Sequence, residues 1–266
     1  MELLCSLCGE PLEKDGKTYV CPNRHSFDIA RQGYVNLLAV QQKRSLHPGD
    51  TREQVLSRRE FLEGGFYAPI RDALCELAAE ESGPILDVGC GEGYYSTYLA
   101  EHLHAELTGL DISKEAVRCA AAKYKNALWL CASAAHLPVQ SASVGILTSL
   151  FALTVPEEFH RVLKPGGAFI QVLAAEDHLL NLKNIIYPTL THKEKNTVPE
   201  VPGFQLEKSV PVQFTFTAEG QQVQNLLSMT PHVYRISKEG AEALKNTPKL
   251  TDTASCVMNL YRRMEC

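Results

Sequence analysis

Asp87-Val88-Gly89-Cys90-Gly91-Glu92-Gly93 is the stretch that decides the fold of this chain. A short apolar run at residues 84–88 leads into it and predicts a buried strand, and residues 94–102 after it have the pattern of a helix. Glycines between a strand and a helix let the backbone approach a ligand, and the first amides of the helix point at that ligand. The stretch therefore predicts a cofactor-binding loop in an α/β sheet.

The spacing of the glycines favours one class of cofactor. Gly89, Gly91 and Gly93 form a GxGxG pattern, whereas a dinucleotide pyrophosphate typically binds GxGxxG. Asp87 would crowd a phosphate but can meet a cationic donor. Asp111 follows the next predicted strand, where a carboxylate can hold ribose hydroxyls. This combination resembles the S-adenosylmethionine-dependent methyltransferases, with Gly89 and Asp111 at the donor.

Strand and helix patterns alternate along most of the chain. The predicted strands are residues 106–110, 127–131, 144–150 and 168–173, and the predicted helices are residues 51–62, 67–81, 114–123 and 157–162. Such alternation gives a doubly wound parallel sheet, and two late strands at 209–216 and 254–261 would add an antiparallel edge. Residues 187–203 are polar and predict a loop. We predict an α/β fold, with a Rossmann-like methyltransferase domain over residues 67–266.

The residues after the third and fourth predicted strands are candidates to contact the donor adenine and the methyl acceptor. After the third strand, many such methyltransferases have an acidic residue that contacts the adenine amine. Here the stretch is Cys131-Ala132-Ser133-Ala134, so we expect adenine contact from backbone groups or the Ser133 hydroxyl. After the fourth strand, we expect the acceptor site to be lined by Thr148, Ser149, Leu150 and Phe151. Phe151 either stacks on a splayed base or packs in the core.

Four residues near the N-terminus have the spacing of a structural zinc site: Cys5, Cys8, Cys21 and His25. Zinc takes four ligands in a tetrahedron, and ligands a few residues apart supply two vertices each. Residues 1–35 are too few to bury a core, so the metal would supply their folding energy. We predict a Zn²⁺-binding module over residues 1–35. The alternative is free thiols beside a surface histidine.

Composition limits the remaining possibilities. The chain has 266 residues, of which 45% are hydrophobic and 21% charged, as is ordinary for a globular protein. No run reaches the length of a membrane span, and the first residues lack the basic start and apolar stretch of a signal peptide. The nine cysteines fit a reducing compartment. We therefore expect a cytoplasmic protein without a membrane contact.

Positive charge concentrates in one segment of an acidic chain. Residues 24–59 contain seven arginines and lysines against three acidic residues, whereas the whole chain has a net charge of −5. A basic segment on an acidic body favours contact with a polyanion. The alternative is a solvated linker with scattered charge. We place a basic connector and its helix at residues 36–66. The candidate polyanion contacts are Arg24, Lys43, Arg44, Arg58 and Arg59.

The zinc quartet followed by the donor loop resembles the bacterial 23S ribosomal RNA guanine-N1 methyltransferases of the RlmA type. Other stretches share the resemblance: Gly33-Tyr34-Val35-Asn36-Leu37-Leu38, Arg58-Arg59-x-Phe61-Leu62 and Met229-Thr230-Pro231. It implies methyl transfer from S-adenosylmethionine to N1 of a guanine in a hairpin of 23S ribosomal RNA. It also implies a zinc module that helps to bind the hairpin, and a homodimer with a positively charged cleft. Residue by residue, it places Tyr67, Gly91, Glu92 and His178 against the donor and Asp111 at its ribose.

The reaction and its alternatives follow from the same residues. Guanine N1 carries a proton at neutral pH, which must be removed, and we identify no catalytic base in the sequence. The chain has neither the Asn/Asp-Pro-Pro-aromatic stretch of exocyclic-amine enzymes nor the Pro-Cys pair of cytosine-C5 enzymes, which leaves a ring nitrogen as the target. The alternatives are a small-molecule methyltransferase with a structural zinc knuckle and a zinc-containing RNA-binding adaptor with a relict donor fold.

Overall fold

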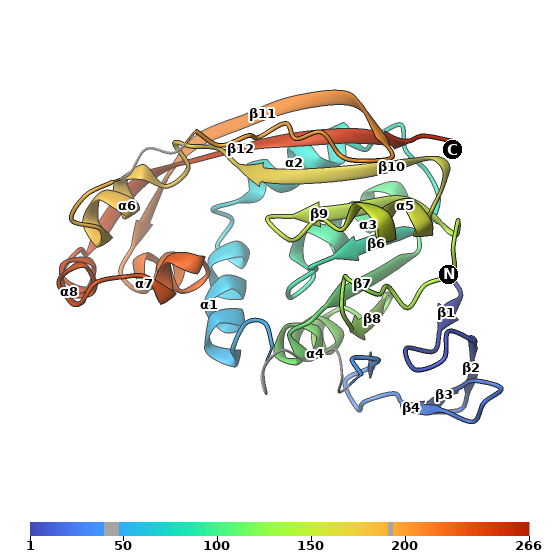
Figure 1. Ribbon diagram of the computed structural model, residues 1–266. Helices are drawn as coiled ribbons and strands as arrows, with labels where there is room; N and C mark the ends of the chain where they lie inside the picture. Colours follow the sequence, from blue (N-terminus) through green and yellow to red (C-terminus); the bar gives the residue numbers. More distant parts are fainter. Residues whose placement is uncertain (40–47, 191–193, 266) are drawn as a thin grey trace.

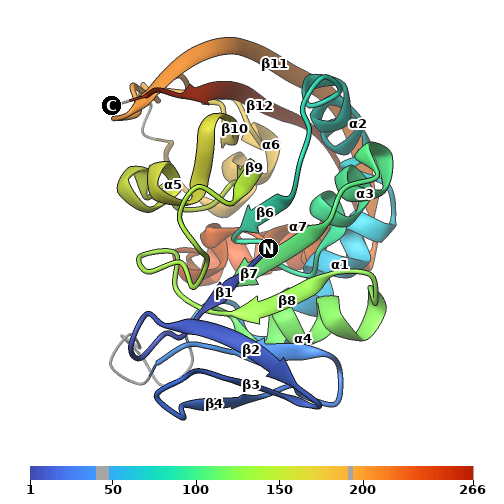
Figure 2. The same cartoon turned by 90° about the vertical axis from the view of Figure 1, so that its right-hand side faces the viewer.

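The computed structural model describes residues 1–39, 48–190 and 194–265. It contains a large mixed sheet with helices against both faces, and a small sheet beside it (Figure 1). Figure 2 shows α2 (Ala68–Leu77) and α3 (Tyr94–Leu103) on one side of the strands and α5 (Pro156–Val162) on the other. This layered arrangement is the predicted α/β fold.

The large sheet has eight strands in the order β11-β12-β10-β9-β6-β7-β8-β5. Their bounds are β5 Tyr34–Asn36, β6 Ile85–Val88, β7 Leu107–Asp111, β8 Leu128–Cys131, β9 Val144–Leu150, β10 Leu163–Ala174, β11 Phe204–Glu219 and β12 Lys249–Arg263. The strands from β10 to β5 pair in parallel, whereas β12 pairs antiparallel with both β10 and β11. The parallel sheet with an antiparallel edge is therefore confirmed. The carboxyl ends of β6, β7 and β9 meet at one edge, where ligands of such sheets bind.

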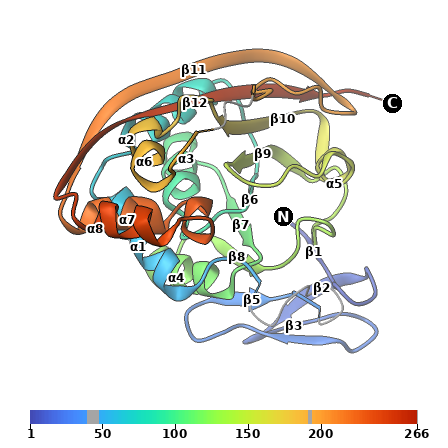
Figure 3. The ribbon, with the colours of Figure 1, turned by 60° about the vertical axis from the view of Figure 1, so that its left-hand side comes forward.

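Two apolar clusters, one on each face of the large sheet, stabilise the fold. The first joins the sheet to α1 (Arg52–Glu63), α2, α3 and α4 (Lys114–Lys123). It also includes α6 (Leu180–Ile186), α7 (Gln221–Ser228) and α8 (Lys238–Lys245), which Figure 3 shows gathered at one end of the molecule. The second joins Phe159 of α5 to Leu3 and Leu12 of the N-terminal segment. Strands covered on both faces are mostly apolar, and all seven residues of β9 are buried, including the polar Thr148 and Ser149.

The small sheet forms the N-terminal module. Its strands pair in the order β1 (Leu3–Leu4), β2 (Pro11–Asp15), β3 (Thr18–Val20) and β4 (Ser26–Asp28). Leu3 forms an antiparallel bridge with Val139, and Leu4 N–H donates to the carbonyl of Pro138. β5 then joins the large sheet beside β8. The module thus shares a core and strand pairing with the large domain, and the domain boundaries at residues 35 and 66 stay predictions.

Capping side chains explain where two predicted helices begin. The Thr51 hydroxyl accepts from Gln54 N–H at 3.3 Å, and the Gln54 side chain accepts from Thr51 N–H at 2.9 Å. This reciprocal pair is a capping box and starts α1. The Ser113 hydroxyl accepts from Ala116 N–H at 3.2 Å and starts α4 in the same manner. Both starting points agree with the sequence prediction.

The structure differs from the prediction at short elements. β10 begins at Leu163, before the predicted start at residue 168, and its register shifts between Leu163 and Ala168. The sequence does not predict α6, α8 or the 3-10 helix η2 (Pro231–Tyr234), because such short runs give little periodicity. The described residues of the 187–203 loop form no helix or strand. None of the helices in the described part of the chain is both long and apolar enough to cross a membrane.

Candidate active site and metal centre

The donor loop, residues 89–93, connects β6 to α3 at the carboxyl edge of the sheet. Its glycines have positive φ angles: 82° at Gly89, 56° at Gly91 and 83° at Gly93. A Cβ on Gly89 would lie 2.5 Å from the Ala152 side chain, and one on Gly93 would lie 2.5 Å from the Trp129 indole. The loop therefore requires glycine both for its backbone conformation and for its packing.

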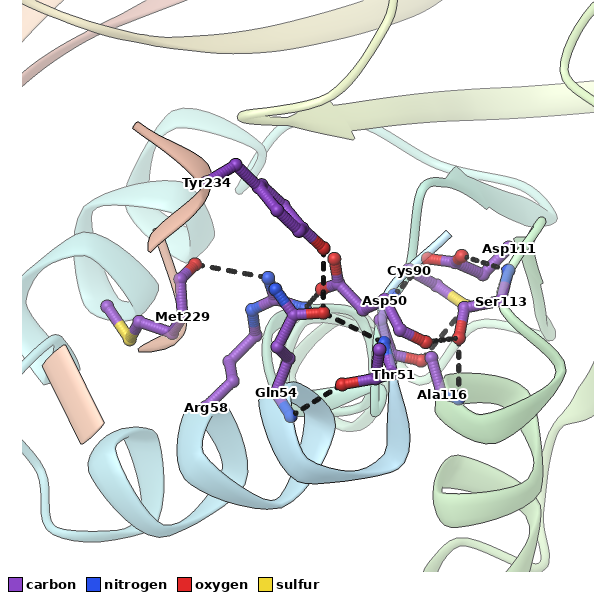
Figure 4. Close-up of polar contacts among 11 residues, drawn as sticks. Asp50, Thr51, Gln54, Arg58, Cys90, Asp111, Ser113, Ala116, Met229 and Tyr234 are labelled. Atoms are coloured by element: carbon purple, nitrogen blue, oxygen red, sulfur yellow. Dashed lines mark hydrogen bonds and ion pairs between the residues drawn. The ribbon is translucent and has the colours of Figure 1, made fainter. Parts of the chain in front are cut away.

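Asp111 ends β7 and its carboxylate binds the donor loop (Figure 4). Oδ2 accepts from Gly91 N–H at 2.9 Å, and Oδ1 accepts from Ser113 N–H at 2.7 Å. Burial raises the pKa of Asp111, while these two hydrogen bonds act to lower it. Each carboxylate oxygen has a second lone pair for a ligand hydroxyl. The structure thus places Asp111 against the loop, and its bond to the donor ribose stays a prediction.

Glu92 is buried within the donor loop, with 5% of its surface exposed. Its Oε2 has no hydrogen-bond partner among the described residues. Burial raises the pKa of Glu92 to about 7, and the charge of Arg58 acts against this rise. A buried carboxylate oxygen without a partner is energetically costly. It fits a ligand that brings positive charge or hydrogen-bond donors, as S-adenosylmethionine does.

Arg58 lies beside the donor loop rather than on an open surface. It forms an ion pair with Asp50 and donates to the carbonyl of Met229 at 3.2 Å (Figure 4). Burial acts to lower the pKa of Arg58, but the carboxylates of Asp50 and Glu92 outweigh it and raise that pKa. Contact of Arg58 with RNA stays a prediction. Its partners in the structure connect α1 to the C-terminal third of the chain.

Tyr67 and His178 meet although 111 residues separate them. The Tyr67 hydroxyl lies 3.4 Å from His178 Nε2, and His178 Nδ1 accepts from Ser255 N–H at 3.1 Å. Because Nδ1 accepts, the ring proton is assigned to Nε2. Burial lowers the pKa of His178 to about 4 and raises the pKa of Tyr67. Both side chains are therefore neutral near pH 7, and their contact with the donor stays a prediction.

Most of the predicted acceptor wall is buried. Thr148 Oγ1 donates to Asp87 Oδ1 at 2.7 Å beneath the donor loop, and burial raises the pKa of Asp87 to about 6. Thr148, Ser149 and Leu150 are covered on both faces of β9, so the prediction that they line the acceptor site is wrong. Phe151 follows the end of the strand and is exposed.

Ser133 lies two residues beyond the end of β8, next to the strand that carries Asp111. Its hydroxyl accepts from Ala135 N–H at 3.3 Å, and its side chain is half-buried. This position is at the edge where the donor loop and Asp111 lie. Contact between Ser133 and the adenine stays a prediction.

The four predicted zinc ligands form one cluster. Their ligand atoms all lie within 4.8 Å of one another. The Sγ atoms of Cys8 and Cys21 are 3.7 Å apart, and Nδ1 of His25 lies 3.5 Å from Cys5 Sγ and 3.4 Å from Cys21 Sγ. A zinc tetrahedron with Zn–S near 2.3 Å has edges of about 3.5–3.8 Å. A hydrogen bond from the Asn23 side chain lowers the pKa of Cys8 to about 6, which favours the thiolate that zinc binds, whereas burial raises the pKa of Cys5 to about 11.

The predicted RNA contacts lie in different parts of the structure. Arg24 is exposed in the turn between Cys21 and His25. Arg59 pairs with Glu63 at 3.1 Å and lies in a groove of about 670 Å³ between α1 and α4. The other basic residues of that groove are Arg52, Arg118 and Lys123. Lys43 and Arg44 lie outside the described residues.

Known proteins resemble this chain along nearly its whole length. Residues 3–46 match the family described as "RlmA, N-terminal", and residues 86–171 match a methyltransferase domain. The 23S rRNA (guanine(748)-N(1))-methyltransferase of Streptomyces fradiae is 32% identical, over 86% of this chain and 84% of that protein. A Bacillus subtilis protein provisionally assigned as a 23S rRNA (guanine-N(1)-)-methyltransferase is 30% identical, over 91% of this chain and 90% of its own. The chain belongs to the 23S rRNA (guanine-N1)-methyltransferase family.

Solved structures support the fold of this family member. Phosphoethanolamine N-methyltransferase 2 of Haemonchus contortus, bound to S-adenosyl-L-methionine, has a TM-score of 0.50 at 14% identity and covers 81% of this chain and 58% of that chain. The methyltransferase in complex with the Trm112 activator of Haloferax volcanii also has a TM-score of 0.50, at 16% identity, over 82% of this chain and 100% of that chain. The chain is thus an S-adenosylmethionine-dependent methyltransferase with a zinc site.

Proposed function

We propose that this protein transfers a methyl group from S-adenosylmethionine to N1 of a guanine in a hairpin of 23S ribosomal RNA. The observation that carries the proposal is the joint match of both parts of the chain. Both family models match this chain, and the relatives that align over most of its length have names that give methylation of 23S rRNA at guanine N1. A small-molecule methyltransferase with an incidental zinc knuckle would not need a zinc module directly before the donor domain.

The residues of the site have distinct tasks in this reaction. In this reaction guanine N1 would attack the methyl group on the positively charged sulfur of the donor, the S–CH3 bond would break to release neutral S-adenosylhomocysteine, and the N1 proton would pass to solvent. The donor loop and Asp111 would hold the nucleoside part of the donor, and Glu92 would offset its positive charge. His178 is neutral with its free proton on Nε2, so it orients its neighbours rather than accepting the N1 proton.

Phosphate contacts would come from two basic regions. Arg24 lies exposed at the zinc site, and Arg59 lies in the groove between α1 and α4. Such contacts supply most of the affinity for RNA and make it sensitive to salt. The groove suits one strand of the hairpin, while the zinc module would contact a second part of the same RNA. We further propose that the protein acts as a homodimer in the cytoplasm.

Primer extension on ribosomal RNA tests the function directly. The RNA is taken from a strain that lacks the gene and is incubated with the protein and S-adenosylmethionine. A methyl group on N1 blocks the pairing edge of guanine, so reverse transcriptase should stop at one new position. Transfer to free nucleosides without this stop would favour the small-molecule alternative. A protein that binds RNA but shows no donor binding by calorimetry would favour the adaptor alternative.

A further inference from the structure

One aromatic side chain leaves the sheet beside the donor loop. β9 ends at Leu150, and Phe151 after it has a φ angle of 53°. Residues other than glycine adopt this left-handed conformation at an energetic cost. The Phe151 side chain is also 41% exposed. Backbone strain of this kind persists where the surroundings impose it, and it clusters at functional sites.

Two residues of β10 hold the strained turn in place. Val172 accepts a hydrogen bond from Phe151 N–H at 2.9 Å. The buried side chain of Gln171 donates to Thr154 Oγ1 at 2.8 Å. These bonds involve the backbone of Phe151 and the far end of the turn, and neither uses the phenyl ring. These bonds hold the backbone of the turn in place and leave the phenyl ring free to contact a ligand.

The turn at Phe151 contacts both the donor loop, through Ala152, and His178 of the Tyr67–His178 pair. Its neighbour Ala152 packs so tightly on Gly89 that a Cβ there would be 2.5 Å from the Ala152 side chain. The Phe151 ring centroid is 6.0 Å from that of His178, with an interplanar angle of 32°, which is within the range of aromatic pairs. His178 therefore packs against the ring, and Phe151 remains partly exposed just after the carboxyl end of β9.

We propose that Phe151 is the residue on which the target guanine stacks. The inference rests on the proposed function and deepens it. A base that leaves an RNA helix loses its stacking neighbours, and aromatic side chains commonly replace them. Phe151 precedes Ala152, which packs on the donor loop. A guanine stacked on Phe151 would therefore be held close to the donor methyl group. Phe151 would thus bind and orient the base, and would take no part in moving its proton.

The test measures single-turnover methylation of 23S ribosomal RNA at saturating RNA. Phe151→Ala should lower the rate about 10- to 100-fold, as expected for the loss of one base stack. Donor affinity should stay the same, and RNA affinity nearly so, because phosphates dominate it. Phe151→Trp should keep the rate, whereas Phe151→Leu should be as slow as Phe151→Ala. Leu206→Ala on β11, where the leucine is also 41% exposed, is the matched control.

Phe151→Gly separates stacking from folding. Glycine adopts a φ of 53° without strain, so this variant should melt at least as high as the wild type and still methylate slowly. A clearly lower melting temperature would assign Phe151 a structural role and overturn the inference. A wild-type rate in Phe151→Leu would also overturn it, with the proposed function intact. If the wild-type protein itself left no stop in primer extension, the proposed function would fail, and the inference with it.

Discussion

At the scale of single residues, buried carboxyl groups gather at the donor loop. Burial raises the pKa values of Asp87, Glu92 and Asp111. The charge of Arg58 acts against this rise for Glu92 and Asp111. Each buried carboxylate is more costly to ionise than one in water. The free site is therefore prepared for a positively charged ligand, which would favour the ionised forms.

Glu92 should make the stability of the donor-free protein fall with rising pH. Its pKa is raised from 4.5 to about 7, so the folded state holds this proton more tightly than the unfolded state. The stabilisation is complete below pH 4.5 and is lost as the pH rises through about 7. Calorimetric melting between about pH 5.5 and 8 should show a shallower decline for Glu92→Gln than for the wild type. The control is Glu101→Gln on the exposed face of α3, and equal slopes for Glu92→Gln and wild type would contradict the prediction.

Asp111→Asn should weaken donor binding without affecting RNA. An amide cannot accept from both Gly91 N–H and Ser113 N–H, and it binds ribose hydroxyls less strongly than a carboxylate does. Hydrogen bonds to charged groups contribute about 1.5–3 kcal/mol, which corresponds to about a 10- to 100-fold loss of affinity. Titration calorimetry measures the donor affinity, with Asp72→Asn on α2 as the control. Normal donor binding would show that Asp111 does not contact the ribose.

At the scale of elements, α1 carries two adjacent arginines with different surroundings. Arg58 is held by Asp50 and Met229 at the donor loop, whereas Arg59 lines the groove against α4. Arg59→Ala should therefore lower the salt dependence of RNA binding by about one phosphate contact. Arg58→Ala should instead reduce donor affinity. Filter binding over a salt series and donor calorimetry compare the two variants, each serving as the control for the other, and the reverse pattern would exchange their roles.

The zinc module should lose its metal when one ligand is removed. Cys8→Ser leaves three ligands, and zinc normally supplies much of the folding energy of so small a unit. Metal analysis should show about one zinc per wild-type chain and much less in the variant. RNA affinity should fall, while donor binding largely survives because nearly all residues of the cluster under α1 to α4 follow the zinc ligands in the chain. Cys119→Ser, outside the cluster, should keep the metal, and an equal zinc content in Cys8→Ser would exclude Cys8 as a ligand.

At the scale of the whole molecule, the sequence predicts what depends on local spacing. The glycine pattern, the carboxylate after the next strand and the Cys–His quartet each lie within short windows, and their placement agrees with the structure. The alternation of strands and helices was enough to predict the sheet and its antiparallel edge. These features follow from backbone rules that act over a few residues.

What the sequence could not predict depends on contacts between distant segments. The pairing of β5 with β8 and the burial of Thr148 require the assembled sheet. The ion pair of Arg58 depends on which side of α1 meets the donor loop, and two adjacent arginines look alike in a charge count. The strain at Phe151 is a backbone angle, and its residue type gives no sign of it.

The place of β12 has a consequence for the time at which the enzyme is assembled. β12 is the last strand in the chain but lies between β10 and β11 in the sheet. During synthesis, β11 therefore has no strand to pair with until Lys249–Arg263 has left the ribosome. The same strand provides the Ser255 amide that orients His178 and the Asp252 carboxylate that accepts from Leu182 N–H at the start of α6. A partly made chain therefore lacks the hydrogen bond that orients His178 toward Tyr67.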